Sequence, residues 1–250
     1  MTKNLQAHLQ LGNNHRAKYA LLPGDPKRID RVKDLLTDPI ELAYNREYRT
    51  VLGHYQEIPI LVTSTGIGGP SAGIAVEELA NLGVSHMIRI GSSGALQKDI
   101  QLGELIIATG AVRDEGTTHA FVKASYPALA DSKLTAVMQK TAEELKFTHH
   151  LGIVRSHDSF YTDHEEETDA YWSNKGILGA DMETAALFVL GALRGLKTAS
   201  VLNVVVPAEG NLEAGINDLV KGEDLATKGE KDQILLALET IVAIEKENKQ

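Results

Sequence analysis

A single arginine stands inside an otherwise apolar stretch near residue 90. Residues 86–90 read His-Met-Ile-Arg-Ile, and residues 91–94 read Gly-Ser-Ser-Gly. Burying Arg89 among aliphatic side chains is costly unless an anion or a carboxylate meets its charge. Glycines let the backbone approach a ligand closely, and serine hydroxyls can donate hydrogen bonds to it. The pattern predicts a strand that ends in an anion-binding loop, or else a strand whose arginine reaches solvent beside an ordinary turn.

Four other short motifs also carry charged or hydroxyl side chains, three of them together with glycine. They occupy residues 21–28 (Leu-Leu-Pro-Gly-Asp-Pro-Lys-Arg), 45–48 (Asn-Arg-Glu-Tyr), 65–71 (Thr-Gly-Ile-Gly-Gly-Pro-Ser) and 179–184 (Gly-Ala-Asp-Met-Glu-Thr). Together with the stretch around Arg89, and in this order, they resemble the nucleoside phosphorylase superfamily. That superfamily contains uridine phosphorylase and the hexameric purine nucleoside phosphorylases. Each motif alone is weak, but five in the right order make chance agreement a poor explanation.

Strands and helices are expected to alternate along the chain. Apolar and β-branched runs predict strands at 19–22, within 42–66, and at 86–91, 104–112, 150–156 and 197–206. Apolar spacing and end signals predict helices at 28–36, 70–82, about 134–145, 163–175 and 227–246, with Gly53 at a turn and a loop at 207–225. No linker or repeat divides the chain, so we expect one α/β domain over residues 1–250. The resemblance implies a three-layer αβα arrangement around a mixed, partly barrel-like sheet.

Composition limits the classes of partner and location. The 250 residues are 43 % apolar, yet no stretch approaches the roughly 20 consecutive apolar residues of a membrane span. A net charge of −9 argues against nucleic acid as a partner, because its phosphate backbone would be repelled. The chain has no cysteine, and its first residues lack the apolar core of a signal peptide. We therefore expect a cytoplasmic protein without nucleic-acid or membrane partners.

The resemblance implies phosphate-dependent cleavage of the N-glycosidic bond of a nucleoside, with inorganic phosphate as co-substrate and no organic cofactor. Phosphate would be held by Arg28, Arg46 and Arg89, together with Gly24 and Ser92. Guanidinium groups match phosphate oxygens well because their N–H donors form a planar fork. Arg89 would also take part in catalysis, because a phosphate beneath the sugar stabilises an oxocarbenium-like transition state. Three unrelated surface arginines are the alternative.

The ribose would be held by the motif at 179–184. Asp181, Met182 and Glu183 match the family's ribose clamp, in which an acid accepts hydrogen bonds from the 2′- and 3′-hydroxyls. Glu183 is the stronger candidate and counts among the catalytic groups. Asp181 is weaker, because the family usually carries glutamate at its position and the shorter aspartate lacks one methylene group. Alternatively, both acids belong to the solvated first turn of a helix. His8 resembles a histidine that reaches the 5′-hydroxyl of a nucleoside in a neighbouring subunit, although such a residue is usually just exposed.

The base-binding residues are less clearly marked. Phe160 resembles the aromatic side chain that stacks on the base, with a partly exposed core residue as the alternative. Both base-reading signatures of the family are absent: a Gln-x-Arg pair is replaced by about His164 and Glu166, and a catalytic aspartate by Val205. His119 and His164 are then the candidates for proton donation to the base, because histidine titrates near neutral pH. In the alternative view both lie on polar loops and contact water.

A cation site and an oligomer are also implied by the resemblance. Glu47, the backbone carbonyl of Ile67, and Ser71 match positions at which uridine phosphorylases hold a monovalent cation, such as K⁺, between two subunits. Carboxylate, carbonyl and hydroxyl oxygens suit a hard ion. An ion pair between Glu47 and an arginine is the alternative. The oligomer would be a hexamer built from dimers.

Uridine is the favoured nucleoside, because residues 65–71 and 76–79 are more similar to uridine phosphorylase. Phosphorolysis of a purine nucleoside is the runner-up. A phosphate-independent nucleosidase is disfavoured by the arginines, since hydrolysis does not need them. A non-catalytic nucleoside-binding protein is suggested only by the absent base readers.

Overall fold

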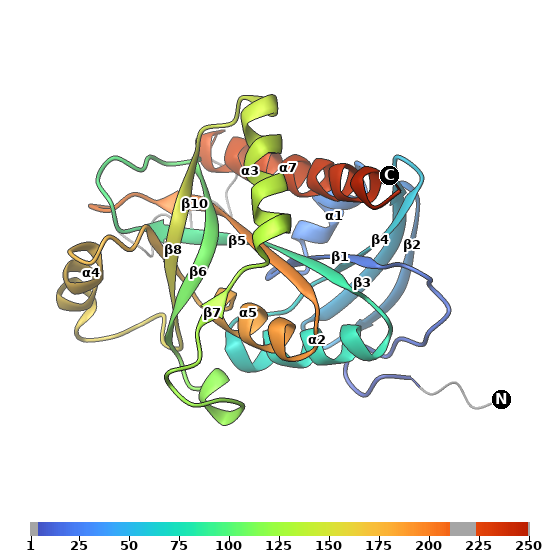
Figure 1. Ribbon diagram of the computed structural model, residues 1–250, viewed down its shortest axis with the longest axis horizontal. Coiled ribbons are helices and arrows are strands. Elements are labelled where there is room, and N and C mark those ends of the chain that lie inside the picture. The colour runs from blue at the N-terminus through green and yellow to red at the C-terminus, as the bar shows by residue number, and fades with distance from the viewer. Residues whose placement is uncertain (1–4, 211–223, 250) are drawn as a thin grey trace.

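The strands form a mixed sheet that closes on itself at one side. The computed structural model describes residues 5–210 and 224–249. Its strands are β1 (Tyr19–Pro23), β2 (Thr37–Asn45), β3 (Tyr48–Tyr55), β4 (Ile58–Thr63), β5 (His86–Ala95), β6 (Leu105–Asp114), β7 (Ala128–Leu129), β8 (His149–His157), β9 (Gly179–Asp181) and β10 (Lys197–Val206). They follow the order β10-β6-β8-β9-β5-β1-β4-β3-β2, with β7 beside β6, and β10 also pairs with β5. This last pairing closes β10, β6, β8, β9 and β5 into a barrel, from which the other strands extend (Figure 1).

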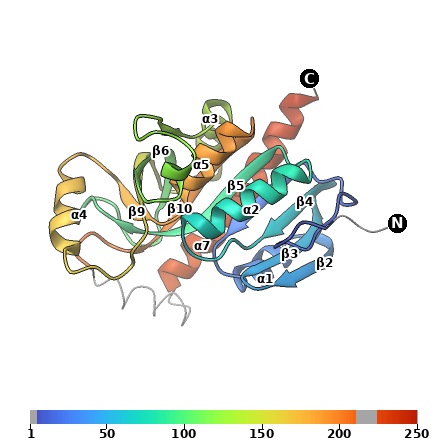
Figure 2. The same ribbon diagram turned by 90° about the horizontal axis from the view of Figure 1, so that it is seen from below.

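Helices cover both faces of this sheet. They are α1 (Arg28–Lys33), α2 (Gly69–Asn81), α3 (Ser132–Leu145), α4 (Glu165–Ser173), α5 (Thr184–Leu193) and α7 (Asp224–Asn248), with a 3-10 turn η1 (Thr118–Ala120). α2 and α5 share one core, and α1, α3 and α7 share the other, on the opposite face (Figure 1 and Figure 2). Along β1, Ala20 and Leu22 enter the first core, while Tyr19 and Leu21 enter the second. The α/β class with helical layers around a partly barrel-like mixed sheet is thereby confirmed.

Local sequence accounts for the limits of α2, whose start borders the candidate site. Gly68 precedes the helix with a φ of 93°, a conformation that favours glycine, and Pro70 occupies its first turn. Val76 and Leu79 are buried on the face turned to the core. Gly83, with a φ of 88°, follows its end. No helix within the described ranges combines the length and apolar character that a membrane crossing requires.

The prediction of a loop at residues 91–94 is wrong. β5 continues to Ala95, because residues 92 and 93 pair with Asn203 and Val204 of β10, and Gly94 pairs with Ala180 of β9. Glycine and serine are typical of turns in isolation, but here a strand on each side completes the backbone hydrogen bonds. The serines therefore belong to the barrel wall.

The turn expected at Gly53 is also wrong. Gly53 lies inside β3, and a Cβ atom there would meet the Leu36 side chain at 2.9 Å. Glycine makes room for a packed neighbour at this position and does not reverse the chain. The loop expected at 207–225 falls mostly on residues 211–223, which lie outside the described residues.

Candidate active site

A pocket of about 680 Å³ gathers residues from several of the predicted motifs. Its Arg89 end consists of Gly24, Arg28, Arg89 and Ser92, and its Phe160 end consists of Arg155, His157, Phe160 and Asp169. The lining also includes Asp181, Met182, Glu183 and Val205. Groups that are far apart in the sequence thus surround one cavity.

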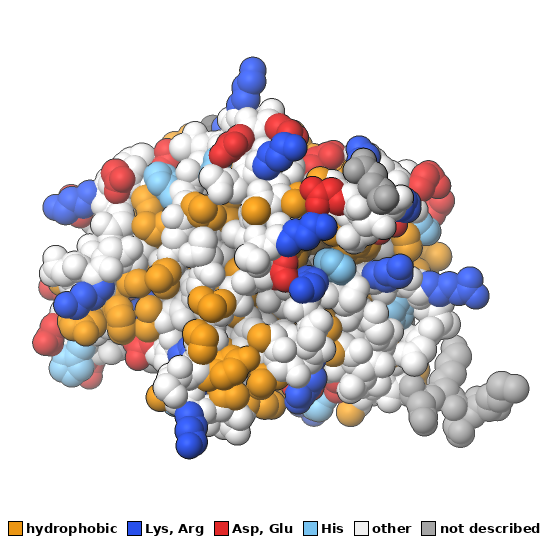
Figure 3. Space-filling model, in the orientation of Figure 1, with side chains coloured by type: hydrophobic (Ala, Val, Ile, Leu, Met, Phe, Trp, Pro, Cys, Tyr) orange, Lys and Arg blue, Asp and Glu red, His pale blue; other side chains and the backbone are white. Residues whose placement is uncertain are grey.

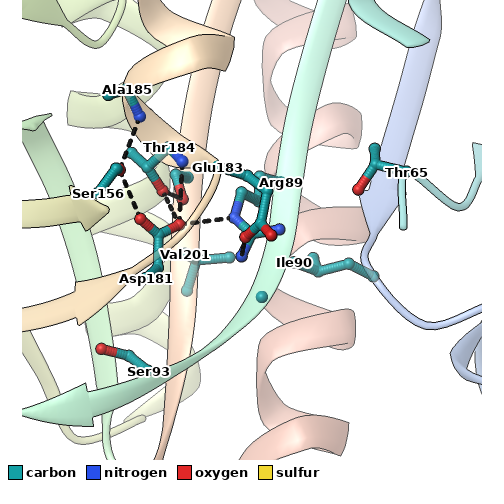
Figure 4. A network of polar contacts seen from close by, with 12 residues as sticks. Thr65, Arg89, Ile90, Ser93, Ser156, Asp181, Glu183, Thr184, Ala185 and Val201 are labelled. Carbon is teal, nitrogen blue, oxygen red and sulfur yellow. Dashed lines mark hydrogen bonds and ion pairs between the residues drawn. The ribbon is translucent and has the colours of Figure 1, made fainter. Parts of the chain in front are cut away.

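Arg89 is buried between two carboxylates (Figure 4). Its Nε donates to Asp181 Oδ2 at 2.9 Å, and its Nη2 lies 2.5 Å from Glu183 Oε2. Nη1 is buried and has no hydrogen-bond partner within the described residues. Because an unsatisfied buried donor costs free energy, Nη1 marks a place for an acceptor from a ligand. Gly91 makes room for the guanidinium group, since a Cβ atom there would lie 2.5 Å from Nη2.

Asp181 accepts four hydrogen bonds from protein donors. Besides Arg89, its Oδ2 accepts from the Thr184 amide at 3.0 Å and from Thr184 Oγ1 at 2.6 Å. Its Oδ1 accepts from Ser156 Oγ at 2.6 Å (Figure 4). A carboxylate offers about four acceptor positions, and the three contacts to Oδ2 and one to Oδ1 leave little of this capacity for a ligand. The geometry therefore favours a role in holding Arg89 and the start of α5 over a direct contact with ribose hydroxyls.

Glu183 is placed differently from Asp181. Its Oε1 accepts from the Gly68 amide at 2.5 Å, while Oε2 faces Arg89. Burial raises the pKa of the Glu183 carboxyl, against the opposing effect of Arg89. A buried carboxylate in this situation is stabilised by further donors, such as the hydroxyl groups of a ligand.

Arg28 is fixed from three sides at the Arg89 end. Its Nη1 donates to the Ile90 carbonyl and its Nη2 to Ser92 Oγ, both at 2.9 Å. Its Nε lies 3.3 Å from Oε1 of Glu230, a buried residue of α7. Burial lowers the pKa of Arg28, an effect that Glu230 opposes and the charge of Arg89 reinforces. Two guanidinium groups close enough to repel each other favour an anion between them.

Four of the predicted residues lie outside this pocket in the single chain. Arg46 is exposed on the turn between β2 and β3, with a φ of 55°. Nδ1 of His8 lies 2.7 Å from Oε1 of Glu78 on α2. His119 is exposed within η1, and His164 borders a hollow that adjoins the pocket. The single chain therefore does not bring these four side chains to the cavity.

Two predicted base-binding residues do line the pocket. The Phe160 ring packs edge-on against Tyr161, with ring centroids 4.9 Å apart. Val205 is buried near the end of β10. An aromatic face and an aliphatic wall suit a flat, largely apolar ring system. Neither residue can exchange a proton with a ligand.

Glu47, Ile67 and Ser71 also line the pocket. Ser71 Oγ donates to Glu47 Oε1 at 2.7 Å and also contacts the Thr65 carbonyl oxygen. The pKa of Glu47 is lowered, first by its own backbone amide and then by Ser71. A carboxylate and a hydroxyl thus lie side by side, as the predicted cation site requires.

Sequence reasoning missed three residues at the Phe160 end. Arg155 and His157 project from β8, and Asp169 belongs to α4, a helix without any buried residue. Burial lowers the pKa of His157, and the charge of Arg155 lowers it further. Burial raises the pKa of Asp169, against the opposing charge of Arg155. The signal that could have found Arg155 and His157 is their i, i+2 spacing just before Phe160, which puts two polar side chains on one face of the strand.

Comparison with protein families decides where this fold and this pocket belong. The model of the phosphorylase superfamily matches residues 18–229, which is most of the chain. The protein belongs to the phosphorylase superfamily. The resemblance inferred from the five sequence motifs is thereby confirmed.

Individual members of the superfamily match over nearly the whole chain. Uridine phosphorylase of Thermococcus kodakarensis is 38 % identical, over 96 % of this chain and 86 % of that protein. Guanosine phosphorylase of Halorubrum lacusprofundi is 36 % identical, over 93 % of this chain and 95 % of that protein. A crystal structure of uridine phosphorylase from Vibrio fischeri, complexed with 6-hydroxy-1-naphthoic acid, has a TM-score of 0.89 and 46 % identity, and covers 96 % of this chain and 97 % of that one.

Proposed function

We propose that this protein cleaves the N-glycosidic bond of a nucleoside with inorganic phosphate, releasing the free base and (deoxy)ribose 1-phosphate, with uridine as the favoured nucleoside. One observation carries the proposal. Arg28 and Arg89 are both buried at one end of the pocket, and Nη1 of Arg89 lacks a partner within the described residues. Phosphate supplies the acceptor oxygens and the negative charge that this pair favours. Water, the nucleophile of a nucleosidase, supplies no such charge.

Release of base from a nucleoside panel tests this proposal directly. Uridine, 2′-deoxyuridine, inosine and guanosine are incubated with and without phosphate, and free base is quantified by chromatography. We expect release that depends on phosphate and is fastest with uridine. Release at an unchanged rate in phosphate-free buffer would show a nucleosidase, and binding without release would show a non-catalytic protein.

The proposed reaction follows from the order of groups along the pocket. A phosphate oxygen, oriented by Arg28 and Arg89, forms a bond to C1′ as the bond from C1′ to the base nitrogen breaks. The electron pair of the broken bond leaves with the base. Positive charge develops on the sugar, and the adjacent phosphate stabilises it. Glu183 accepts hydrogen bonds from the ribose hydroxyls beside Met182, while Asp181 keeps Arg89 oriented.

Phe160 and Val205 are proposed to enclose the base. His119 and His164, the predicted proton donors, lie outside the pocket of the single chain. Proton donation by either one therefore requires a rearrangement of its segment or a neighbouring copy of the chain. A variant with both histidines replaced by alanine tests this role, because full uridine activity in that variant removes it.

We propose a homo-oligomer built from dimers, with a hexamer as the complete assembly. His8 and Arg46 lie outside the pocket of their own chain, which supports a contribution from each to the pocket of a second copy. Exposed apolar side chains offer surface for such contacts, and Figure 3 shows them gathered over β8, β7 and the region of η1. They include Phe121, Leu129, Leu151 and Ile153.

We expect His8→Ala to weaken the binding of nucleosides more than the binding of their 5′-deoxy analogues, and equal losses would contradict a shared site.

The pocket also supports the predicted monovalent cation, with Glu47, Ser71 and the carbonyl of Ile67 as ligands. The hydrogen bond between Ser71 Oγ and Glu47 Oε1 places two oxygen ligands together. Replacement of K⁺ by a large organic cation at constant ionic strength tests this site. Activity and stability that remain unchanged in both buffers would remove the cation from the proposal.

Phosphorolysis of a purine nucleoside is the second candidate function. The match to a guanosine phosphorylase over nearly the full chain favours it. Faster turnover of guanosine or inosine than of uridine in the panel would establish it in place of the first.

We also propose that residues 1–250 act as one domain in the cytoplasm. The pocket draws its residues from one continuous sheet, which supports a single unit. The cysteine-free composition supports a reducing compartment. Cell fractionation with an antibody against the protein tests the location.

A further inference from the structure

Arg155 brings a guanidinium group to the Phe160 end of the pocket. Its side chain is 11 % exposed, and its Nε donates to Asp114 Oδ2 at 2.7 Å. Asp169 Oδ1, on α4, lies 3.8 Å from Nη1, which is too far for a hydrogen bond. Within the described residues, Nη1 and Nη2 therefore keep N–H donors for a ligand, while Asp114 fixes the orientation of the group.

His157 adds an acceptor beside this donor. It lies two residues beyond Arg155 on β8, and both side chains line the pocket. Its Nδ1 lies 2.9 Å from the carbonyl oxygen of Ser159, which can only accept, so Nδ1 carries a proton. In the neutral ring Nε2 is then an acceptor. Burial and Arg155 both lower the pKa of His157, which favours the neutral ring at neutral pH.

A donor fork next to an acceptor matches one edge of one base. With the ribose at Glu183, the base edge farthest from the glycosidic bond is the one that faces the Phe160 end. On that edge uracil presents the O4 carbonyl, which accepts, and N3–H, which donates. Cytosine presents an amino donor at C4 and an acceptor at N3, so both contacts would be mismatched.

We propose that Arg155 and His157 read the base, with Arg155 donating to O4 of uracil and His157 accepting from N3–H. The two residues would take over the task of the Gln-x-Arg pair that this chain lacks. The inference rests on the proposed function, because it assumes a nucleoside in this pocket. It makes Arg155 and His157 the residues that determine specificity for uracil over cytosine.

Substrates that lack one or both contacts separate this role from a purely structural one. The pyrimidin-2-one riboside has neither O4 nor N3–H, whereas N3-methyluridine keeps O4 and lacks only N3–H. We expect Arg155→Met to lower kcat/KM for uridine by about ten- to a hundredfold. The same variant should change kcat/KM for the riboside without O4 by less than about threefold, because that substrate never made the contact. His157→Ala should show the same pattern with uridine and N3-methyluridine.

Arg194→Met is the matched control. Nε of Arg194 donates to Glu77 Oε2 at 2.7 Å, the same contact that Arg155 makes with Asp114, but the pair lies outside the pocket. This variant should leave kcat/KM for every substrate unchanged. If Arg155→Met lowers kcat/KM equally for uridine and for the pyrimidin-2-one riboside, or lowers it for neither substrate, Arg155 does not read the base. A loss confined to inosine would overturn the assignment to uracil.

Binding of free uracil keeps this inference separate from the proposed function. Calorimetric titration in phosphate buffer compares uracil with cytosine for the wild-type protein and Arg155→Met. Uracil binding that depends on Arg155 supports the reader even if no nucleoside is cleaved, in which case the proposed function alone fails. Wild-type uracil binding that is undiminished in Arg155→Met, or no preference for uracil over cytosine, overturns the reader even if phosphorolysis occurs.

Discussion

The two ends of the pocket hold their charged groups in different ways. At the Arg89 end, Arg28 and Arg89 are buried, and their partners Glu230, Asp181 and Glu183 are buried with them. At the Phe160 end, the partners of Arg155 are carboxylates that remain 41–43 % exposed. One end is part of the protein core, and the other is a set of side chains on the rim of the barrel.

This difference indicates how a phosphorylase can retain its phosphate site while its preference for the base of the nucleoside changes. Buried ion pairs hold their geometry tightly, but the loss of one partner leaves an uncompensated charge in the core. Exposed pairs contribute little to stability, so they can be replaced at low cost. In the proposed function, phosphate is common to every such reaction and would bind at the buried end, whereas the base would bind at the end that tolerates substitution.

The largest effect is expected from Arg89→Met. Removal of the guanidinium group leaves Asp181 and Glu183 buried together, so we expect the free energy of unfolding to fall by about 3–5 kcal/mol. Phosphorolysis should fall by about a hundred- to a thousandfold, because the anion loses a buried donor. Urea denaturation and initial rates measure the two effects. An unchanged free energy of unfolding would show that the Arg89 end does not contribute to the core as a buried ion-pair network.

Glu230→Ala is expected to have the next largest effect. It leaves Arg28 buried without its carboxylate, which should lower the free energy of unfolding by about 3 kcal/mol and raise KM for phosphate about tenfold. Glu41→Ala is the matched control, because Glu41 pairs with Arg49 at 2.9 Å but is 41 % exposed. The control should cost less than about 1 kcal/mol. Equal losses in the two variants would erase the distinction between buried and exposed partners.

Asp169→Asn should have a small effect that is confined to the base. Asp169 is 41 % exposed, and its Oδ1 lies 3.8 Å from Nη1 of Arg155, beyond hydrogen-bond distance. The free energy of unfolding should therefore change by no more than about 0.5 kcal/mol. KM for uridine should rise about two- to fivefold because Arg155 is held less firmly, while KM for phosphate stays constant. A change in KM for phosphate would show that the two ends are coupled.

The smallest effect is a dependence of uridine binding on pH. Burial and Arg155 lower the pKa of His157 below the ordinary histidine value of about 6.5, so the folded protein takes up this proton less readily than the unfolded chain. Stability from the neutral ring is therefore complete above about pH 6.5 and is lost as the pH falls through the lowered value. KM for uridine should be constant from about pH 8 to about pH 6.5 and rise below that range. His157→Gln should abolish the rise, and its persistence would assign it to another group.

The Arg89 end was largely predictable because its motifs are local. Gly24, Arg28, Arg89 and Ser92 all line the pocket, as the sequence indicates, and Glu183 lies among them. An arginine within an apolar run, beside glycines, can be recognised from the local sequence alone as a candidate buried charge. The same local pattern misled at residues 91–94, where neighbouring strands converted an expected loop into strand.

Apart from Phe160 itself, the Phe160 end was not predictable because its contacts join distant parts of the chain. Arg155 meets Asp114 across paired strands, and it faces Asp169 because α4 lies beside the barrel. Neither neighbour follows from spacing in the sequence. The predicted proton donors, His119 and His164, lie outside the cavity. Composition identifies a polar loop, but the direction in which its side chains point is set by packing.

The sequence by itself determined the superfamily, the alternation of strands and helices, and that Arg89 stands in an apolar run where its charge needs a partner. These properties depend on residue type and short-range order, which the hydrophobic effect and backbone geometry translate directly into local structure. The tertiary structure alone decided that Asp181 accepts four hydrogen bonds from the protein, that Nη1 of Arg89 lacks a partner within the described residues, and that Arg155 lines the Phe160 end of the pocket. Hydrogen bonds of 2.6–3.0 Å to Asp181 depend on strand register and helix placement, which only the closed barrel fixes.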